Sequence, residues 1–292
     1  MMSRPRLRGR GAAIFAAVLG LGLRPAVAEA APTAIQFAPH RAVYEVSLKR
    51  ASPSSGIADL SGRMVYELTG NACEGYAQNF RYVTVETDHE GVRRIGDFRS
   101  TSWEDAAGRT LRFHTTNYQD NKLASATQGE AGRKQAGGEA AVDLVRPAKR
   151  QLSLAPGVLF PMQHSAALLG AAEAGKTHLA ADLYDGSERG DKVSQTTAII
   201  GRQSSPGAIK PPELANGDKL RNVASWPVSI GFFETSASPG DAVPTAEQSY
   251  RYYANGVSTD LVTDFGDRAL RFDLKQLTFL EEKACEPNAA RP

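Results

Sequence analysis

The segment Val43-Tyr44-Glu45-Val46-Ser47-Leu48 alternates apolar and polar side chains and indicates the fold class. In a β-strand, successive side chains point to opposite faces, so Tyr44, Val46 and Leu48 are predicted to face an interior. The pattern returns in four further stretches, at residues 80–85, 111–114, 270–274 and 277–280. Because each stretch has one apolar and one polar face, the chain is predicted to be mainly β, with a sheet wrapped around an interior.

Turn-forming residue pairs separate these stretches. Pairs that contain glycine or asparagine join neighbouring antiparallel strands as hairpins. About a dozen or more strands in one antiparallel sheet are predicted on this basis. The pairs are Gly70-Asn71, Glu90-Gly91, Ala107-Gly108, Asp120-Asn121, Gly137-Gly138, Asp185-Gly186 and Asn255-Gly256.

One segment, rich in alanine and leucine, breaks the β pattern. Pro161 suits the first turn of a helix, and Gly175 suits its end. Met162 and Leu169 share one face of this helix, while Leu168 lies on another, so nearly every side is apolar. A helix that is apolar nearly all round is buried. The simplest architecture is one long antiparallel sheet curled around this single α-helix.

The N-terminus has the three parts of a secretory signal peptide. Four arginines in the first ten residues precede an apolar run at 12–23, and Ala26-Val27-Ala28 follows. This pattern predicts cleavage after Ala28, with Ala30 as a second option. The apolar run is too short to cross a bilayer, and no later segment is apolar enough to do so. Residues 1–28 are therefore predicted to be removed, leaving a soluble exported chain without a membrane span.

The export segment also accounts for the net positive charge of the whole chain. Of the 34 lysines and arginines, five lie within residues 1–28, so 29 remain against 32 acidic residues. The mature chain is therefore slightly acidic. A basic surface is the usual electrostatic requirement for nucleic-acid binding, and this composition gives no argument for it.

The chain has only two cysteines, Cys73 and Cys285, near opposite ends of the predicted mature chain. In an oxidising compartment, an isolated pair of this kind predicts a structural disulfide. A redox-active pair would instead be expected in a C-x-x-C motif, which is absent. A bond across 212 residues requires both ends of the chain to meet, so residues 29–292 are predicted to form one domain.

The motifs for nucleotide and metal binding lack the structural context or the residue spacing that such sites require. Residues 170–177 match the phosphate-binding P-loop pattern, but the predicted helix precedes the loop instead of following it. The segment 182–187 could offer oxygen ligands to a cation, although an Asp-Gly turn between two strands needs the same residues. The five histidines show no metal-ligand spacing. No cofactor and no metal are predicted.

No motif for hydrolysis is complete either. A G-x-S-x-G sequence is absent, and His89-Glu90 is followed by Arg93 where a zinc-binding motif needs histidine. A hydrolase acting on envelope material would need His164 or His114 beside a serine and an acid in the folded chain. His164 lies on the predicted buried helix, where a hydrogen-bonded core residue is the simpler interpretation. The chain is predicted not to be an enzyme.

An ordered set of sequence features resembles the cell-envelope integrity EipB family, which consists of periplasmic proteins of certain Gram-negative bacteria. The resemblance covers nearly the whole predicted mature chain and depends on the order of these features more than on any single one. They are residues 40–44 near the mature N-terminus, Cys73 after the second predicted strand, Phe160-Pro161 with His164, the turn at 182–186, and Cys285.

The resemblance implies a periplasmic location and a β-spiral or open barrel that encloses a helix. It also implies a disulfide, here between Cys73 and Cys285, and a non-catalytic role in maintaining the envelope. Binding of another envelope component, a protein, is the leading hypothesis. The family's spiral is similar in shape to periplasmic carriers of lipoproteins, so carriage of a lipid or acylated ligand is the alternative. Met162, Leu168 and Leu169 would then form an apolar wall for that ligand.

Overall fold

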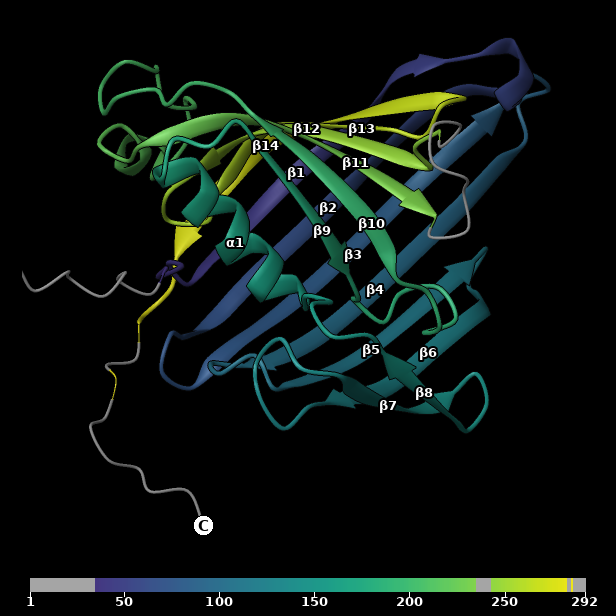
Figure 1. Ribbon diagram of the computed structural model, residues 1–292. Coiled ribbons are helices and arrows are strands. Elements are labelled where there is room, and N and C mark those ends of the chain that lie inside the picture. The colour runs from purple at the N-terminus through teal and green to yellow at the C-terminus, as the bar shows by residue number, and fades with distance from the viewer. Residues whose placement is uncertain (1–34, 235–242, 283–284, 286–292) are drawn as a thin grey trace, which may run out of the picture. The chain divides into compact units, whose positions relative to one another are not determined.

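The computed structural model describes residues 35–234, 243–282 and 285, so the predicted signal peptide lies outside the described residues. Fourteen strands form one sheet in which neighbouring strands pair antiparallel (Figure 1). The order across the sheet is β8-β7-β6-β5-β4-β3-β2-β1-β14-β13-β12-β11-β10-β9. The chain therefore builds the sheet outward from β1 to one edge at β8, and then from the other edge, β9, back to β14 beside β1.

The elements have the following bounds. The α-helix in the described part of the chain is α1 (Pro161–Glu173), and two short 3₁₀ helices span Pro53–Ser55 and Gly217–Leu220. The strands are β1 (His40–Ala51), β2 (Ile57–Asn71), β3 (Gly75–Asp88), β4 (Arg93–Asp105), β5 (Thr110–Gln119), β6 (Lys122–Gly132), β7 (Ala140–Arg146), β8 (Arg150–Leu154), β9 (His178–Leu183), β10 (Ser194–Ile200), β11 (Ser225–Glu234), β12 (Ala246–Tyr253), β13 (Ser258–Asp264) and β14 (Arg268–Phe279).

The alternating strands place their apolar side chains on the inner face of the sheet, as predicted. In β1, Tyr44 and Val46 are buried, whereas Glu45 between them is exposed. The buried residues form one apolar cluster around α1 and β10–β12, a second on β1, β2 and β14, and a third on β5–β8. These clusters supply most of the stabilising burial, because apolar area removed from water is the main favourable term in folding.

The two C-terminal stretches of alternation, 270–274 and 277–280, form one strand, β14, instead of two. The register with β1 shifts between Tyr44–Leu274 and Val43–Gln276, which leaves one extra residue, Lys275, in β14. A β-bulge of this kind changes which residues face inward. The apolar period therefore restarts at Leu277, which made one strand look like two in the sequence.

The sheet curls until its two edges approach each other without pairing along their length. A single parallel bridge joins β9 to the segment that follows β8: the amide of Leu159 donates to the Asp182 carbonyl at 2.8 Å, and the amide of Tyr184 donates to the Leu159 carbonyl at 2.9 Å. We call this contact the seam. Beyond it, Tyr184 enters the third cluster, is fully buried, and meets Phe113 edge-to-face with ring centroids 5.8 Å apart.

The helix α1 lies within the curve of the sheet, alongside β9 (Figure 1). It begins at Pro161 as predicted, and Gly175, with a φ of 70°, follows its end in the left-handed conformation that glycine tolerates. Its buried residues include Met162, Leu168 and Leu169. These features confirm the predicted fold class: a mainly β chain with one highly curved, open antiparallel sheet around a helix.

A buried carboxylate holds the start of α1. Glu104, at the end of β4, is 4% exposed and accepts hydrogen bonds from the amides of Met162 at 2.7 Å and Gln163 at 3.1 Å. The first amides of a helix have no partner within the helix, so an acceptor from another element satisfies them. Arg133, directly after β6, donates to the carbonyl of Val158 at 2.9 Å. Glu104 thereby fixes the helix to the sheet.

This contact predicts a specific pH dependence of stability. Burial raises the pKa of Glu104 from 4.5 to about 7 in the folded protein, so the folded state holds this proton more tightly than the unfolded state. The stabilisation is complete below about pH 4.5 and is lost as the pH rises through about 7, a change of about 3 kcal/mol. Urea unfolding between pH 5 and 8 should show Glu104→Gln gaining stability relative to wild type as the pH rises.

The difference between the two proteins is the quantity to measure. Burial lowers the pKa of His40 and of His164, which adds a pH dependence of opposite sign to both proteins. This contribution cancels in the difference. A difference that stays constant across this range would show that Glu104 is ionised in the folded protein at every pH tested.

A disulfide ties the C-terminal segment of the chain to the sheet. Cys73 lies in the turn between β2 and β3 and is bonded to Cys285, with 5.7 Å between their Cα atoms. The Asn71 side chain accepts hydrogen bonds from the amides of Cys73 and Glu74 and so shapes this turn. In the described residues, no helix has the length and apolar character needed to cross a membrane.

Candidate functional site

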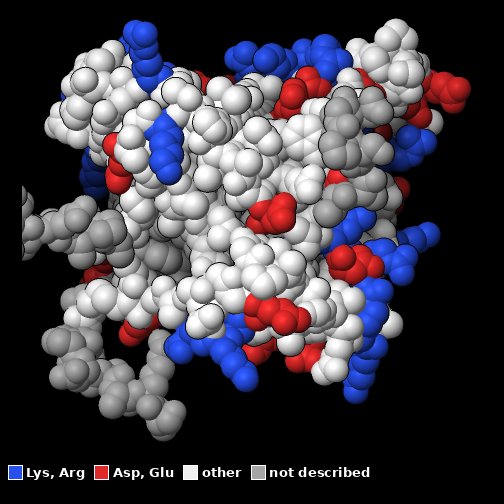
Figure 2. All heavy atoms as spheres, in the orientation of Figure 1, with Lys and Arg blue, Asp and Glu red and all other residues white. Residues whose placement is uncertain are grey.

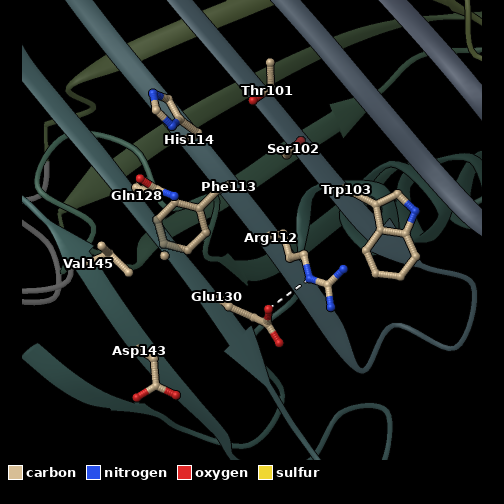
Figure 3. Close-up of a pocket in the computed structure, with 11 residues that line it drawn as sticks. Thr101, Ser102, Trp103, Arg112, Phe113, His114, Gln128, Glu130, Asp143 and Val145 are labelled. Carbon is tan, nitrogen blue, oxygen red and sulfur yellow. Dashed lines mark hydrogen bonds and ion pairs between the residues drawn. The ribbon is translucent and has the colours of Figure 1, made fainter. Parts of the chain in front are cut away.

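An open groove of about 620 Å³ lies on the outer face of β4, β5, β6 and β7 (Figure 3). We call it the Trp103 groove. Its lining mixes aromatic, charged and polar side chains, and it is open to solvent. The lining residues are Thr101, Ser102, Trp103, Arg112, Phe113, His114, Gln128, Gly129, Glu130, Asp143 and Val145.

The strand registers set the geometry of the groove. Trp103 of β4 stands opposite Arg112 of β5, Arg112 opposite Glu130 of β6, and Glu130 opposite Asp143 of β7. Directly paired residues have their side chains on the same face, about 5 Å apart. These four residues therefore form a continuous row across four strands, all on the face that points away from the core (Figure 3).

The charges in this row are mostly paired with one another. Arg112 Nε donates to Glu130 Oε2 at 2.9 Å, and its guanidinium lies 5.3 Å from the centre of the Trp103 ring. Asp143 accepts a hydrogen bond from the Gln151 side chain at 2.7 Å. Exposed ion pairs of this type contribute little stability, on the order of 0–1 kcal/mol. We therefore expect these side chains to serve recognition of a partner more than stability of the fold.

The composition of the groove suits contact with a protein. Trp and Arg are enriched among the residues that dominate protein–protein binding energy. Small-molecule pockets are typically enclosed and mainly apolar, whereas this groove is open and seven of its eleven lining residues are polar or charged. An extended surface with an aromatic–arginine pair at its centre is therefore the arrangement that the residues support.

The two histidines considered for hydrolysis lie in different environments. His164 in α1 is buried, and its Nε2 donates to Thr196 Oγ1 at 2.9 Å, because that hydroxyl itself donates to the carbonyl of Ala181. His114 lies in the Trp103 groove, on the outer face, opposite Thr101. Among the described residues, no hydrogen bond joins either histidine to a serine. Neither forms the nucleophile–base contact that hydrolysis by this route needs.

The candidate cation segment, residues 182–187, comprises the end of β9 and the start of the loop to β10. The Asp185 side chain accepts a hydrogen bond from the amide of Ser187 at 2.8 Å, and Gly186 adopts a left-handed φ of 69°. This is the turn chemistry of an Asp-Gly pair. No cluster of three or more acidic, histidine or cysteine side chains within the described part of the chain is arranged to hold a metal ion.

The predicted apolar wall lies in the first cluster. Met162, Leu168 and Leu169 are 7%, 1% and 0% exposed and pack with residues such as Tyr76 and Trp226. Side chains of the protein therefore occupy the space in front of this wall. Carriage of a ligand there stays a prediction.

The Trp103 groove was not predicted from the sequence. Alternation along 111–114 places Arg112 and His114 on the polar face, but it does not reveal which residues of neighbouring strands join them. The turn pair Ala107-Gly108 contains part of the missing information, because a hairpin centred there places Trp103 opposite Arg112, as observed.

Comparison with known proteins places these features in a family. A family described as EipB-like matches residues 31–281. The cell envelope integrity protein EipB of Brucella abortus (strain 2308) is 38% identical over 250 residues, which cover 86% of this chain and 87% of that protein. A crystal structure of a beta-barrel-like protein of the DUF1849 domain from Brucella abortus superimposes with a TM-score of 0.77 at 35% identity, and covers 85% of this chain and all of that one.

Proposed function

Because the chain belongs to the EipB-like family, we propose that it maintains the integrity of the cell envelope, in the periplasm, by binding another envelope protein in the Trp103 groove. The row of Trp103, Arg112 and Glu130 carries the choice of site. These side chains lie on the outer face, contribute little to the core, and present an aromatic–arginine pair to solvent. The proposed action is binding and involves no catalysis.

The prediction for this proposal is a loss of envelope resistance without a loss of folding. In a strain that lacks the protein, Trp103→Ala should fail to restore survival in detergent, with a loss of at least about tenfold, if a central aromatic contact worth roughly 2 kcal/mol or more is removed. Survival on detergent plates is the measurement. The periplasmic level and the melting temperature of the variant should stay close to those of wild type.

Tyr118 provides a matched control on the same face of the sheet. Arg99 lies 5.0 Å from the centre of its ring, so this pair repeats the aromatic–arginine contact outside the groove. Tyr118→Ala should restore resistance fully. If Trp103→Ala also restores it, the groove is not the binding site. If both variants fail, the effect belongs to the outer face in general.

Carriage of an acylated ligand is the second candidate function. The observation that favours it is an aromatic strip on the inner face of β3 and β4, where Phe80, Tyr82 and Phe98 are only half-buried. Phe80 and Phe98 meet edge-to-face with ring centroids 5.8 Å apart. Native mass spectrometry of protein purified without detergent distinguishes the two functions, because only the carrier would retain a bound lipid.

A further inference from the structure

The strand next to the Trp103 groove, β8, is an open edge of the sheet. It pairs with β7 on one side, and no strand in the described part of the chain pairs with it on the other. The opposite edge, β9, is partly occupied, because Leu159 bonds to the backbone of Asp182 and Tyr184. An unpaired edge offers a row of backbone donors and acceptors to an additional strand.

The alternation of hydrogen bonds across successive strands shows which groups of β8 are free. The amide of Arg133 donates to the carbonyl of Arg109 at 2.9 Å, which fixes the bonded pairs between β5 and β6. Followed through the registers of β6, β7 and β8, this places the amides and carbonyls of Gln151 and Ser153 on the free side. Both residues are exposed, and no described residue bonds to these backbone groups.

The side chains at this edge define what an added strand would meet. Leu152 points to the inner face, is half-buried, and packs against the third cluster, so it offers apolar surface beside the free edge. On the outer face, Gln151 lies beside Asp143 of the Trp103 groove. An added strand would therefore continue the outer face of the groove by one strand, with apolar side chains on its inner face.

Basic residues lie at the β7–β8 turn, where an added strand would begin or end. They are Arg146, Lys149 and Arg150, and of these only Arg150 has an ion pair, with Asp191 at 2.6 Å. Lysine and arginine side chains gather at the lower right of Figure 2, where Figure 1 places β7 and β8. This charge favours an acidic residue in the added segment and disfavours a basic one.

We propose that the partner protein adds an extended segment to β8, as a strand that alternates apolar and polar residues and carries acidic residues beside the β7–β8 turn. This inference rests on the proposed function and names the form of the partner at that site. Strand addition derives its affinity from main-chain hydrogen bonds and its specificity from alternate side chains. The backbone of Gln151 and Ser153 would supply the bonds, and Lys149 the charge preference.

Two labelled peptides test the proposal against the mature protein: Glu-Thr-Val-Thr-Val-Thr-Val-Glu and the same peptide with lysine in place of glutamate. Fluorescence anisotropy should show binding of the acidic peptide and at least tenfold weaker binding of the basic one. Amide hydrogen exchange should slow at Gln151 and Ser153 when the acidic peptide binds. The amide of Leu152 should not change, because it already bonds to β7. Absence of binding, or protection elsewhere only, overturns the proposal.

Gln151→Pro removes one outward amide, and Gln151→Thr is the matched control that loses the same side chain but keeps the amide. Proline at an outward-facing edge position leaves the ladder to β7 intact. Peptide binding should fall at least tenfold in Gln151→Pro and stay within about twofold in Gln151→Thr. Equal binding by both variants overturns strand addition. Dimers of the wild type that Gln151→Pro abolishes would also overturn it, in favour of a second copy as the occupant.

The envelope assay separates this inference from the proposed function. If Gln151→Pro restores detergent resistance and Trp103→Ala does not, the groove binds a partner without strand addition. If neither variant affects resistance, the proposed function itself is wrong. If both variants fail and Gln151→Thr restores resistance, both proposals stand.

Discussion

Replacement of Cys73 by serine should lower the free energy of unfolding by about 3–5 kcal/mol, because it deletes a crosslink that encloses a loop with a sequence separation of 212 residues. A bond of this length mainly restricts the unfolded chain, so its removal gives the unfolded state more conformational freedom. Cys73 is exposed in its turn, so serine causes little strain in the folded protein. Urea unfolding of the oxidised mature protein is the measurement.

The reciprocal variant provides the control. Cys285→Ser should cost as much as Cys73→Ser, and the double variant should cost no more than either single one, because all three lack the same bond. Reductant should destabilise wild type to a similar level and leave the variants unchanged. Additive losses in the double variant would show that each cysteine acts through separate contacts and not through the disulfide.

The fold could be predicted largely from local pattern. Alternation in stretches such as 43–48 determines which side chains are buried, and Pro161 and Gly175 mark the helix between the two halves of the sheet. These features depend on residues close together in the chain. The approach of β9 to the segment that follows β8 depends on contacts between residues far apart in the chain, such as Leu159 with Leu183, and no local pattern contains it.

The groove shows where local pattern stops being sufficient. The turn pair Ala107-Gly108 gives the correct partner of Trp103, because the hairpin between β4 and β5 has no irregularity. The next turn, Asp120-Asn121, would place Arg112 opposite residue 129. The register shifts by one residue between Asn117 and Tyr118, so Arg112 stands opposite Glu130 instead. A one-residue shift changes the face of every later partner, so the acidic half of the row could not be predicted.

Contacts of buried polar side chains could not be predicted from the sequence either. Glu104 precedes Asp105 and the β4–β5 turn, where acidic residues are usually exposed, yet it is buried because α1 begins beside it. The sequence separation between Glu104 and Met162 gives no indication of this contact. Tyr184 was predicted only as part of a turn, although it fills the third cluster across the seam.

Truncation of Tyr184 should therefore have the other large effect on stability. Tyr184→Ala should lower the free energy of unfolding by about 3–5 kcal/mol, the usual cost of deleting a fully buried aromatic ring. The variant leaves a cavity beside Phe113 and removes the hydrogen bond from the Tyr184 hydroxyl to the Gly190 carbonyl at 2.9 Å. Urea unfolding measures the loss, and amide exchange at Leu159 reports whether the seam opens.

Tyr184→Phe separates the ring from the hydroxyl. It keeps the contact with Phe113 and removes only the bond to Gly190, so it should cost about 1 kcal/mol and leave exchange at Leu159 slow. Fast exchange at Leu159 in Tyr184→Ala, at urea concentrations where the protein stays folded, would show that the ring holds β9 to the segment that follows β8. If exchange at Leu159 speeds up only with global unfolding, Tyr184 stabilises the core without controlling the seam.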